Sequence, residues 1–203
     1  MNLRTIFNIN FQMLALCFLV SFNISSQEQV IEDIIVTAEK RDESLQTVSQ
    51  AVTAITDSEL EAKNISSFVD LTALVPGVTV AKNEGYKTVI SIRGVGNETN
   101  QNAIAAPSVA YHMDGIFVAS PFSLQTDFVD VERIEVLRGP QGTLFGQNST
   151  GGAINVISNK PTSDDFYAKT DITVGDYNLT KIGTAINFPI SDKLATKLTV
   201  SSI

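Results

Sequence analysis

The chain has 203 residues, of which 43% are hydrophobic and 18% are charged. This length suffices for one domain with a buried core, and the composition argues against wholesale disorder. The formal net charge of −8 argues against a nucleic-acid-binding protein, because no basic cluster is present to neutralise phosphates. Cys17 and His112 are the only cysteine and histidine, which rules out an intramolecular disulfide and argues against a Cys/His metal site.

The first 26 residues have the pattern of a secretory signal peptide. Arg4 is their only charged side chain, an apolar run extends from about Phe11 to Phe22, and small residues follow at Ser25 and Ser26. The apolar run is shorter than the roughly 20 residues that a membrane-spanning helix needs. We therefore predict that residues 1–26 are a signal peptide that is removed on export.

Residues 27–45 are a polar, acidic leader with a single apolar island, Ile34–Ala38. This island is too small to build a core of its own. One interpretation is that it adds as a strand to the exposed sheet edge of a partner protein. The other, with equal weight, is that it is an ordinary first strand paired within the domain.

Short helices and strands follow the leader. Gln50–Ile55 predicts a strand, and Thr56 with Glu59 forms a capping box that predicts a helix to about Lys63. Pro76–Gly77 ends a second helix. The apolar face of that helix is formed by Phe68, Leu71, Leu74 and Val75. Further short strands are predicted at 78–80, 89–93, 109–113 and 133–138, and the mixture indicates a small α+β domain.

The segment Asp130–Pro161 places two strand-like runs around a glycine-rich turn. Gly146–Gly151 is its closest approach to a phosphate-binding loop, but Gly152 and Ala153 stand where that loop requires Lys and Ser or Thr. A histidine-based triad is also unavailable, because the chain has one histidine. We therefore predict that the protein is not an enzyme and has no catalytic residue, metal site or cofactor.

The last segment alternates apolar and polar residues with a period of two. Three runs, Phe166–Val174, Thr180–Phe188 and Leu194–Val200, have about the length of a transmembrane β-strand. A soluble antiparallel sheet gives the same alternation. Three strands cannot close a barrel, and open sheet edges are not tolerated in lipid. Either these strands belong to a soluble sheet, or the sequence is a fragment of a longer protein.

Five motifs, in order, resemble those of the TonB-dependent outer-membrane receptors. Asp33–Ala38 (DIIVTA) resembles their TonB box, and Leu71–Val78 is similar to their helix-ending L-x-x-x-P-G-V stretch. Ile92–Gly94 matches the I-R-G of their plug domain, and Tyr111–Gly115 resembles a Y-x-D-G strand and turn. Val131–Asn155 matches the long plug signature V-E-R-I-E-V-L-R-G-P, which continues to G-G-x-I-N.

The resemblance implies an α+β plug domain followed by the first antiparallel strands of a transmembrane β-barrel, in a chain that ends early. It also implies an organisation in four parts. These are a signal peptide at 1–26, a periplasmic leader with the TonB box at 27–45, the plug at 46–161, and the first three barrel strands at 162–203.

The resemblance further implies roles for particular residues. The TonB box would comprise Asp33, Ile34, Ile35, Val36, Thr37 and Ala38. Ligand-facing plug loops would include Asn97, Glu98, Asn100, Gln101, Asn102, Phe122 and Ser123. Structural turns with positive φ or close backbone approach would use Gly94, Gly139, Gly142, Gly146, Gly151 and Gly152. Arg93 and Arg138 would lock the plug to barrel carboxylates, with local pairing to Glu132 or Glu135 as the alternative. His112 is expected to be exposed or to face the barrel, and we assign it no role.

The implied function is TonB-energised uptake of a scarce nutrient across the outer membrane of a Gram-negative bacterium. An iron–siderophore complex is the expected substrate. The implied partners are TonB, outer-membrane lipid and this small molecule, with no nucleic acid. Another reading is a secreted or periplasmic plug-only interaction module without transport activity.

Overall fold

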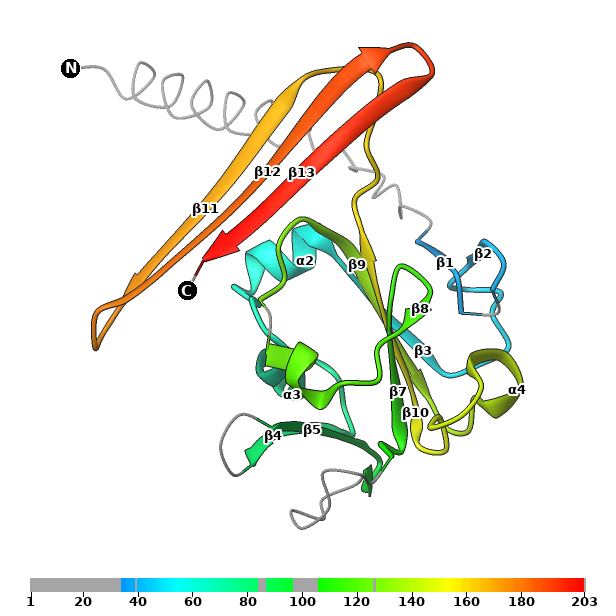
Figure 1. Ribbon diagram of the computed structural model, residues 1–203. Helices are drawn as coiled ribbons and strands as arrows, with labels where there is room; N and C mark the ends of the chain where they lie inside the picture. Colours follow the sequence, from blue (N-terminus) through cyan, green and yellow to red (C-terminus); the bar gives the residue numbers. More distant parts are fainter. Residues whose placement is uncertain (1–33, 39, 84–86, 97–105, 126, 203) are drawn as a thin grey trace, which may run out of the picture. The chain divides into compact units, whose positions relative to one another are not determined.

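The computed structural model describes residues 34–38, 40–83, 87–96, 106–125 and 127–202 (Figure 1). Its helical elements are α2 (Asp57–Ala62), η1 (Phe68–Asp70), α3 (Leu71–Leu74), η2 (Pro121–Gln125) and α4 (Gly142–Phe145). The strands before residue 160 are β1 (Ile35–Val36), β2 (Glu43–Ser44), β3 (Val52–Thr56), β4 (Val78–Asn83), β5 (Lys87–Ile92), β6 (Val95–Gly96), β7 (Val109–Met113), β8 (Ile116–Phe117), β9 (Val131–Arg138) and β10 (Gly152–Ser158). The strands after it are β11 (Tyr167–Gly175), β12 (Leu179–Ser191) and β13 (Leu194–Ser202).

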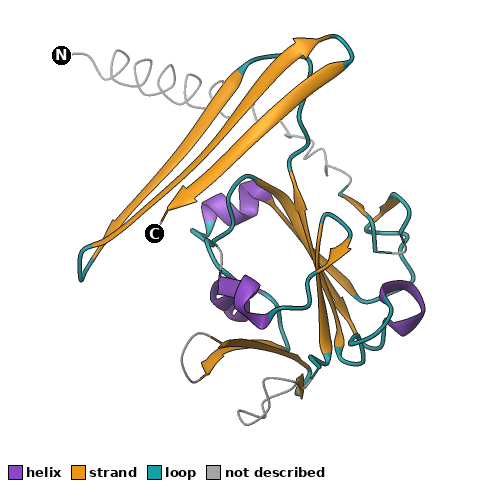
Figure 2. Ribbon diagram, in the orientation of Figure 1, coloured by secondary structure: helices purple, strands orange, loops and turns teal. Residues whose placement is uncertain are grey.

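A five-stranded sheet with the order β3-β9-β10-β7-β8 is the centre of the α+β part (Figure 2). The β10–β7 pair is parallel and the other three pairs are antiparallel. The register places Ile134 between Ile55 and Val156, so apolar side chains form continuous rows across the strands. The strand-like runs predicted around the glycine-rich turn are therefore β9 and β10, and they lie side by side.

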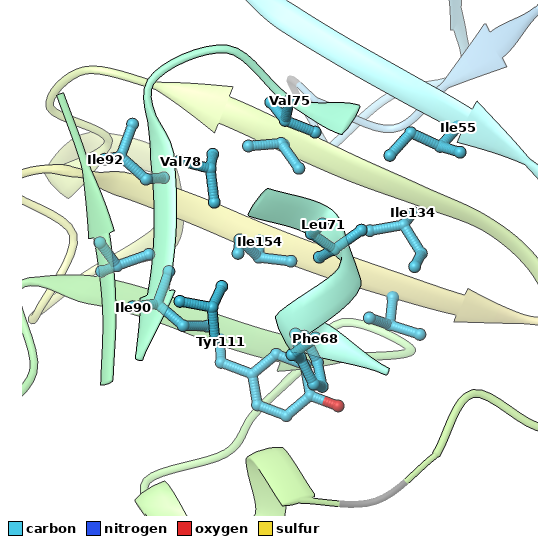
Figure 3. Packing of buried hydrophobic residues seen from close by; sticks show 14 of the residues in the cluster. Ile55, Phe68, Leu71, Val75, Val78, Ile90, Ile92, Tyr111, Ile134 and Ile154 are labelled. Atoms are coloured by element: carbon cyan, nitrogen blue, oxygen red, sulfur yellow. The ribbon is translucent and has the colours of Figure 1, made fainter. Parts of the chain in front are cut away.

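The main hydrophobic core lies on one face of this sheet, where α2, α3 and the β4–β5 pair pack (Figures 1 and 3). Phe68, which is 1% exposed, is central to it: its ring lies 5.0 Å from that of Tyr111 and 4.7 Å from that of Phe128. Burial, with a smaller contribution from the Asp114 carboxylate, raises the pKa of Tyr111 to about 12. Tyr111 therefore stays neutral and acts as a core residue.

Helix α2 begins where the capping residues predict. The Thr56 hydroxyl accepts a hydrogen bond from the Glu59 N–H, and α2 starts at the next residue, Asp57. The Asp70 carboxylate accepts from the N–H and the hydroxyl of Ser67 at 2.8 Å each, which caps η1. The second predicted helix is present as two short pieces, η1 and α3. The α+β fold class predicted from the sequence is thus confirmed.

The opposite face of the central sheet carries small side chains. Ala54, Ala110 and Ala153 are buried there beside Leu137, and the leader lies over them. Figure 1 shows β1, β2 and α4 on this side of the sheet, away from α2 and α3. We call the face formed by Ala54, Ala110, Ala153, Leu137 and Glu135 the leader face.

The strands β11, β12 and β13 form a separate antiparallel sheet whose register is regular apart from a shift between Pro189 and Ser191. The even-numbered apolar residues in or beside these strands are exposed: Phe166, Ile172, Val174, Ile182, Phe188, Ile190, Leu194, Leu198 and Val200. The odd-numbered Ala185 and Asn187 are buried. The alternation predicted from the sequence is thus present. Within the described residues, none of the helices has the length and apolar character needed to cross a bilayer.

Gly152 joins the glycine-rich turn to β10 at a point without space for a side chain. Its φ is +149°, and a Cβ atom there would lie 2.2 Å from the carbonyl oxygen of Leu137. Gly142, the first residue of α4, differs: no heavy atom lies within 4 Å of the Cβ position and its φ is ordinary.

We predict that Gly152→Ala lowers the free energy of unfolding by about 2 kcal/mol or more, because β9 and β10 must separate to admit the methyl group. Gly142→Ala, the matched control, should change it by less than about 0.5 kcal/mol. Chemical denaturation of the two variants measures the difference. Equal stabilities would contradict the close approach of β9 and β10 at Gly152.

Candidate functional site

The segment Ile34–Ala38, which the sequence indicates as a TonB box, is paired within the chain. Ile35 pairs with Ser44 and Val36 with Glu43, and the N–H of Leu45 donates to the carbonyl of Ile34 at 2.8 Å. One backbone edge of the segment is therefore occupied by β2. In this state the segment is a strand of its own domain, the second of the two sequence interpretations. Asp33, the first residue of the predicted box, lies outside the described residues.

Apolar burial fixes one side of this leader segment. Val36 and Ala38, two residues apart and so on the same side of an extended chain, are both 0% exposed and pack in the cluster of the leader face. Ile35, between them, is 45% exposed. The alanines of the sheet make room for Val36, because larger side chains would hold the leader away from the strands.

The buried carboxylate of Glu135 holds the leader segment on the sheet through hydrogen bonds. Glu135 lies in the middle of β9 and is 0% exposed. Its Oε1 accepts a 2.7 Å hydrogen bond from the N–H of Thr37, and the Thr37 hydroxyl lies 3.1 Å from both carboxylate oxygens. Arg133 Nε donates to Glu135 Oε1 at 2.9 Å, and Asn155 Nδ2 donates to Oε2 at 3.4 Å. A buried charge needs such partners, so the hydrogen bonds from Thr37 offset part of the free-energy cost of burying the Glu135 carboxylate.

His112 is buried on the same side of the sheet, and the expectation that it is exposed or faces the barrel is wrong. It is 3% exposed, and its ring lies 5.5 Å from that of Phe117 and 5.1 Å from that of Phe145. Burial lowers the pKa of His112, and the ammonium group of Lys40 lowers it further. Lys40 belongs to the leader and lies 5.5 Å from the Phe145 ring centre. The leader thus helps to keep His112 neutral.

A cavity of about 490 Å³ opens beside the docked segment. It is lined by Ile35, Thr37, Lys40, Arg133, Phe145 and Asn155, among others. The sheet therefore covers one side of the leader segment, and the cavity leaves another side accessible.

Of the two arginines predicted to lock the plug to the barrel, Arg93 lies in a turn and Arg138 is the last residue of β9. Arg93 is exposed, has a φ of +53°, and donates its backbone N–H to Gly77 at 2.7 Å. Arg138 ends β9, and its Nε is buried without a hydrogen-bond partner in the described part of the chain. Glu132 and Glu135, offered as alternative local partners, both pair with Arg133. The lock between these arginines and barrel carboxylates stays a prediction.

The predicted ligand loops are only partly covered by the structure. Asn97, Glu98, Asn100, Gln101 and Asn102 lie outside the described residues. Phe122 and Ser123 lie in η2, where the Ser123 N–H donates to Ser120 at 3.1 Å.

The glycines predicted as structural turns differ in their conformations. Gly94, Gly139 and Gly146 have φ values of +77°, +100° and +76°. A Cβ atom at Gly151 would lie 2.8 Å from the Val95 carbonyl oxygen.

Arg133, Asn155 and Lys40 were not singled out from the sequence as site residues, and Glu135 was named only as an alternative partner of Arg93 and Arg138. Glu135 carried a signal: it is a charged residue between Ile134 and Val136 in a strand that is otherwise apolar at its centre. Thr37 is 98 residues away in sequence, so the sequence alone does not indicate their contact.

We predict that Thr37→Val loosens the leader. Valine keeps the shape of threonine but removes the hydroxyl from a buried charge, and such a bond contributes about 1.5–3 kcal/mol. Amide hydrogen exchange of residues 34–38 should accelerate by about tenfold or more. Thr37→Ser, which keeps the hydroxyl, is the control and should stay close to the wild type. Unchanged exchange in Thr37→Val would show that the hydroxyl does not hold the leader.

We also predict a loss of stability as the pH falls through the ordinary histidine pKa of about 6.5. Because the pKa of His112 is lowered in the folded chain, the unfolded chain binds a proton on this histidine at a higher pH than the folded chain does. Acid therefore lowers the free energy of the unfolded state relative to the folded state. The free energy of unfolding, measured between about pH 7.5 and about pH 5, should fall less steeply in His112→Gln than in the wild type. Parallel curves would contradict a neutral, buried His112.

Comparisons with known proteins agree with this geometry. A family model described as the TonB-dependent receptor plug domain matches residues 44–153. The chain is 32% identical over 146 residues to the pesticin receptor of Yersinia pestis, an alignment that covers 70% of this chain and 21% of the receptor. It is 29% identical over 152 residues to the vitamin B12 transporter BtuB of Vibrio vulnificus (strain CMCP6), covering 72% and 24%.

Among solved structures, the ferric yersiniabactin uptake receptor FyuA from Yersinia pestis superimposes with a TM-score of 0.64 and 27% identity, covering 75% of this chain and 24% of that one. The chain spans between a fifth and a quarter of the length of these curated relatives. Because the plug model covers more than half of its residues, the chain belongs to the family of TonB-dependent receptors.

Proposed function

We propose that this chain is the N-terminal part of an outer-membrane receptor that takes up a scarce nutrient with energy delivered through TonB. The observation that carries the proposal is the docked leader segment, an apolar strand that is held on the plug by a few specific contacts. Its relatives include receptors and transporters of this family, which supports the same role. In this proposal the signal peptide directs the chain across the inner membrane.

The substrate that we propose is an iron–siderophore complex. One relative of known structure is a ferric yersiniabactin uptake receptor, while another relative is a vitamin B12 transporter. The ligand would bind on the outer side of the plug, at the amide-rich residues 97–102 and at residues 122–123. Amide side chains there offer both donors and acceptors to a polar ligand.

The outward face of β11, β12 and β13 supports a place in the outer membrane. β11 and β13 have 9 residues each and β12 has 13, and a tilted transmembrane strand needs about 9–11. One face of this sheet exposes residues such as Ile172, Ile182 and Leu198. Lipid would cover this apolar face, and we propose that these are the first strands of a barrel.

The docked leader explains why TonB would not engage at all times. One edge of the leader segment is paired with β2, and the N–H of Thr37 on the other side is taken by Glu135. A TonB strand that adds to the segment by β-augmentation needs those backbone groups free. Undocking exposes Val36 and breaks the bonds to Glu135, a cost of a few kcal/mol that binding of a ligand elsewhere on the plug can offset.

The test is deletion of Ile34–Thr37 from the receptor that carries this chain in the cell. Removing these residues should abolish uptake of radioactive iron from a siderophore that the cells use, while binding of that complex to the cell surface is retained. Asp42→Ala, at an exposed leader residue outside the box, is the control and should retain uptake. Uptake that survives the deletion would refute the assignment of the TonB box.

A further inference from the structure

A row of three buried polar side chains crosses the leader face of the central sheet. The register pairs His112 of β7 with Asn155 of β10, and Asn155 with Glu135 of β9. Asn155 and Glu135 both hydrogen-bond to Thr37 of the leader. His112 differs from them, because its Nδ1 atom is buried and has no hydrogen-bond partner in the described part of the chain. A titratable ring with a free hydrogen-bonding atom therefore lies beside the bonds that hold the leader.

Phe145 of α4 connects His112 to the leader. The edge-to-face contact between the two rings has a centroid separation of 5.1 Å, and the ammonium group of Lys40 lies 5.5 Å from the centre of the Phe145 ring. A cation over an aromatic face is attracted to it, so this contact helps to hold the leader. An imidazolium at His112 would place a second cation beside the same ring, where it would repel the first. Docking of Lys40 therefore favours the neutral form of His112.

The other groups around His112 do not cancel this repulsion. β8 and α4 contribute aromatic rings and β10 contributes a neutral amide. The carboxylates of Glu135 and Asp114 would favour an imidazolium, but Glu135 is paired with Arg133, and Asp114 accepts two hydrogen bonds of 2.8 Å from β10. Burial is the larger cause of the lowered pKa of His112, and the charge of Lys40 acts in the same direction.

Detachment of the leader weakens both causes, because it removes Lys40 and opens the leader face to water. The detached state therefore binds a proton on His112 at a higher pH than the docked state does. Docking is then strongest above the ordinary histidine pKa of about 6.5, and it weakens as the pH falls below that value. A single proton of this kind raises the ratio of detached to docked leader by at most about tenfold per pH unit.

We infer that His112, Phe145 and Lys40 form a pH-sensitive contact, in which protonation of His112 displaces Lys40 and releases the segment Ile34–Ala38. The main core lies on the opposite face of the sheet and stays folded when the segment leaves. Acid around the leader is then a signal for release that acts in addition to a ligand elsewhere on the plug. The inference concerns detachment alone, so it does not rest on which partner the released segment binds.

A spin label at Ile35→Cys, in a Cys17→Ser background and in detergent micelles, measures the ratio of mobile to immobile leader. Between about pH 7.5 and about pH 5.5 this ratio should rise about threefold or more when His112 is present. In His112→Gln, whose polar side chain does not take up the proton, it should change by less than about 1.5-fold. This comparison separates the proton on His112 from those on carboxylates. Circular dichroism should show the same strand content at both pH values.

Removal of the lysine charge tests the other side of the contact in the same labelled chain. Lys40→Met keeps most of the side-chain length, and the rise between the two pH values should be smaller than with lysine. Lys193→Met, at an exposed lysine in the turn between β12 and β13, is the matched control and should keep the full rise. An equal rise in His112→Gln, a full rise in Lys40→Met, or loss of strand content together with release of the label would each overturn the inference.

Discussion

The buried carboxylate of Glu135 is the interaction on which the arrangement of the leader depends. It lies in the second strand of the central sheet and binds Arg133 in its own strand, Asn155 in the next strand, and Thr37 of the leader. A carboxylate with no exposed surface cannot lose a partner without a free-energy penalty. The leader is therefore held by a small number of directional bonds, and disturbing the carboxylate weakens them together.

The two faces of the central sheet explain why release of the leader need not unfold the plug. Large side chains such as Ile134, Ile154 and Phe68 fill one face, where the core is extensive. The leader face has alanines at 54, 110 and 153, so the sheet contributes smaller side chains to the apolar cluster there than to the main core. We expect the main core to survive when the leader detaches, because the two apolar clusters lie on opposite sides of the sheet.

Local rules predict much of this fold, and distant contacts account for what they miss. Thr56 and Glu59 identify the start of α2, and the period of two identifies β11–β13, because both signals depend on residues close in sequence. The sequence also indicates the strand in the leader, but it does not indicate that Glu135 binds it, because Thr37 and Glu135 are 98 positions apart. His112 was misjudged because its burial results from Phe117, Phe145 and Lys40, which only the folded chain brings together.

The most direct measurement is a double-mutant cycle between Thr37 and Glu135, using Thr37→Val, Glu135→Gln and both together. The equilibrium between docked and detached leader is read from a spin label at Ile35→Cys, an exposed position of the segment, in a Cys17→Ser background. The account predicts a coupling free energy of about 1–3 kcal/mol, with a mobile label in both single variants. Additive effects of the two substitutions would contradict it, because the carboxylate and the threonine would then act independently.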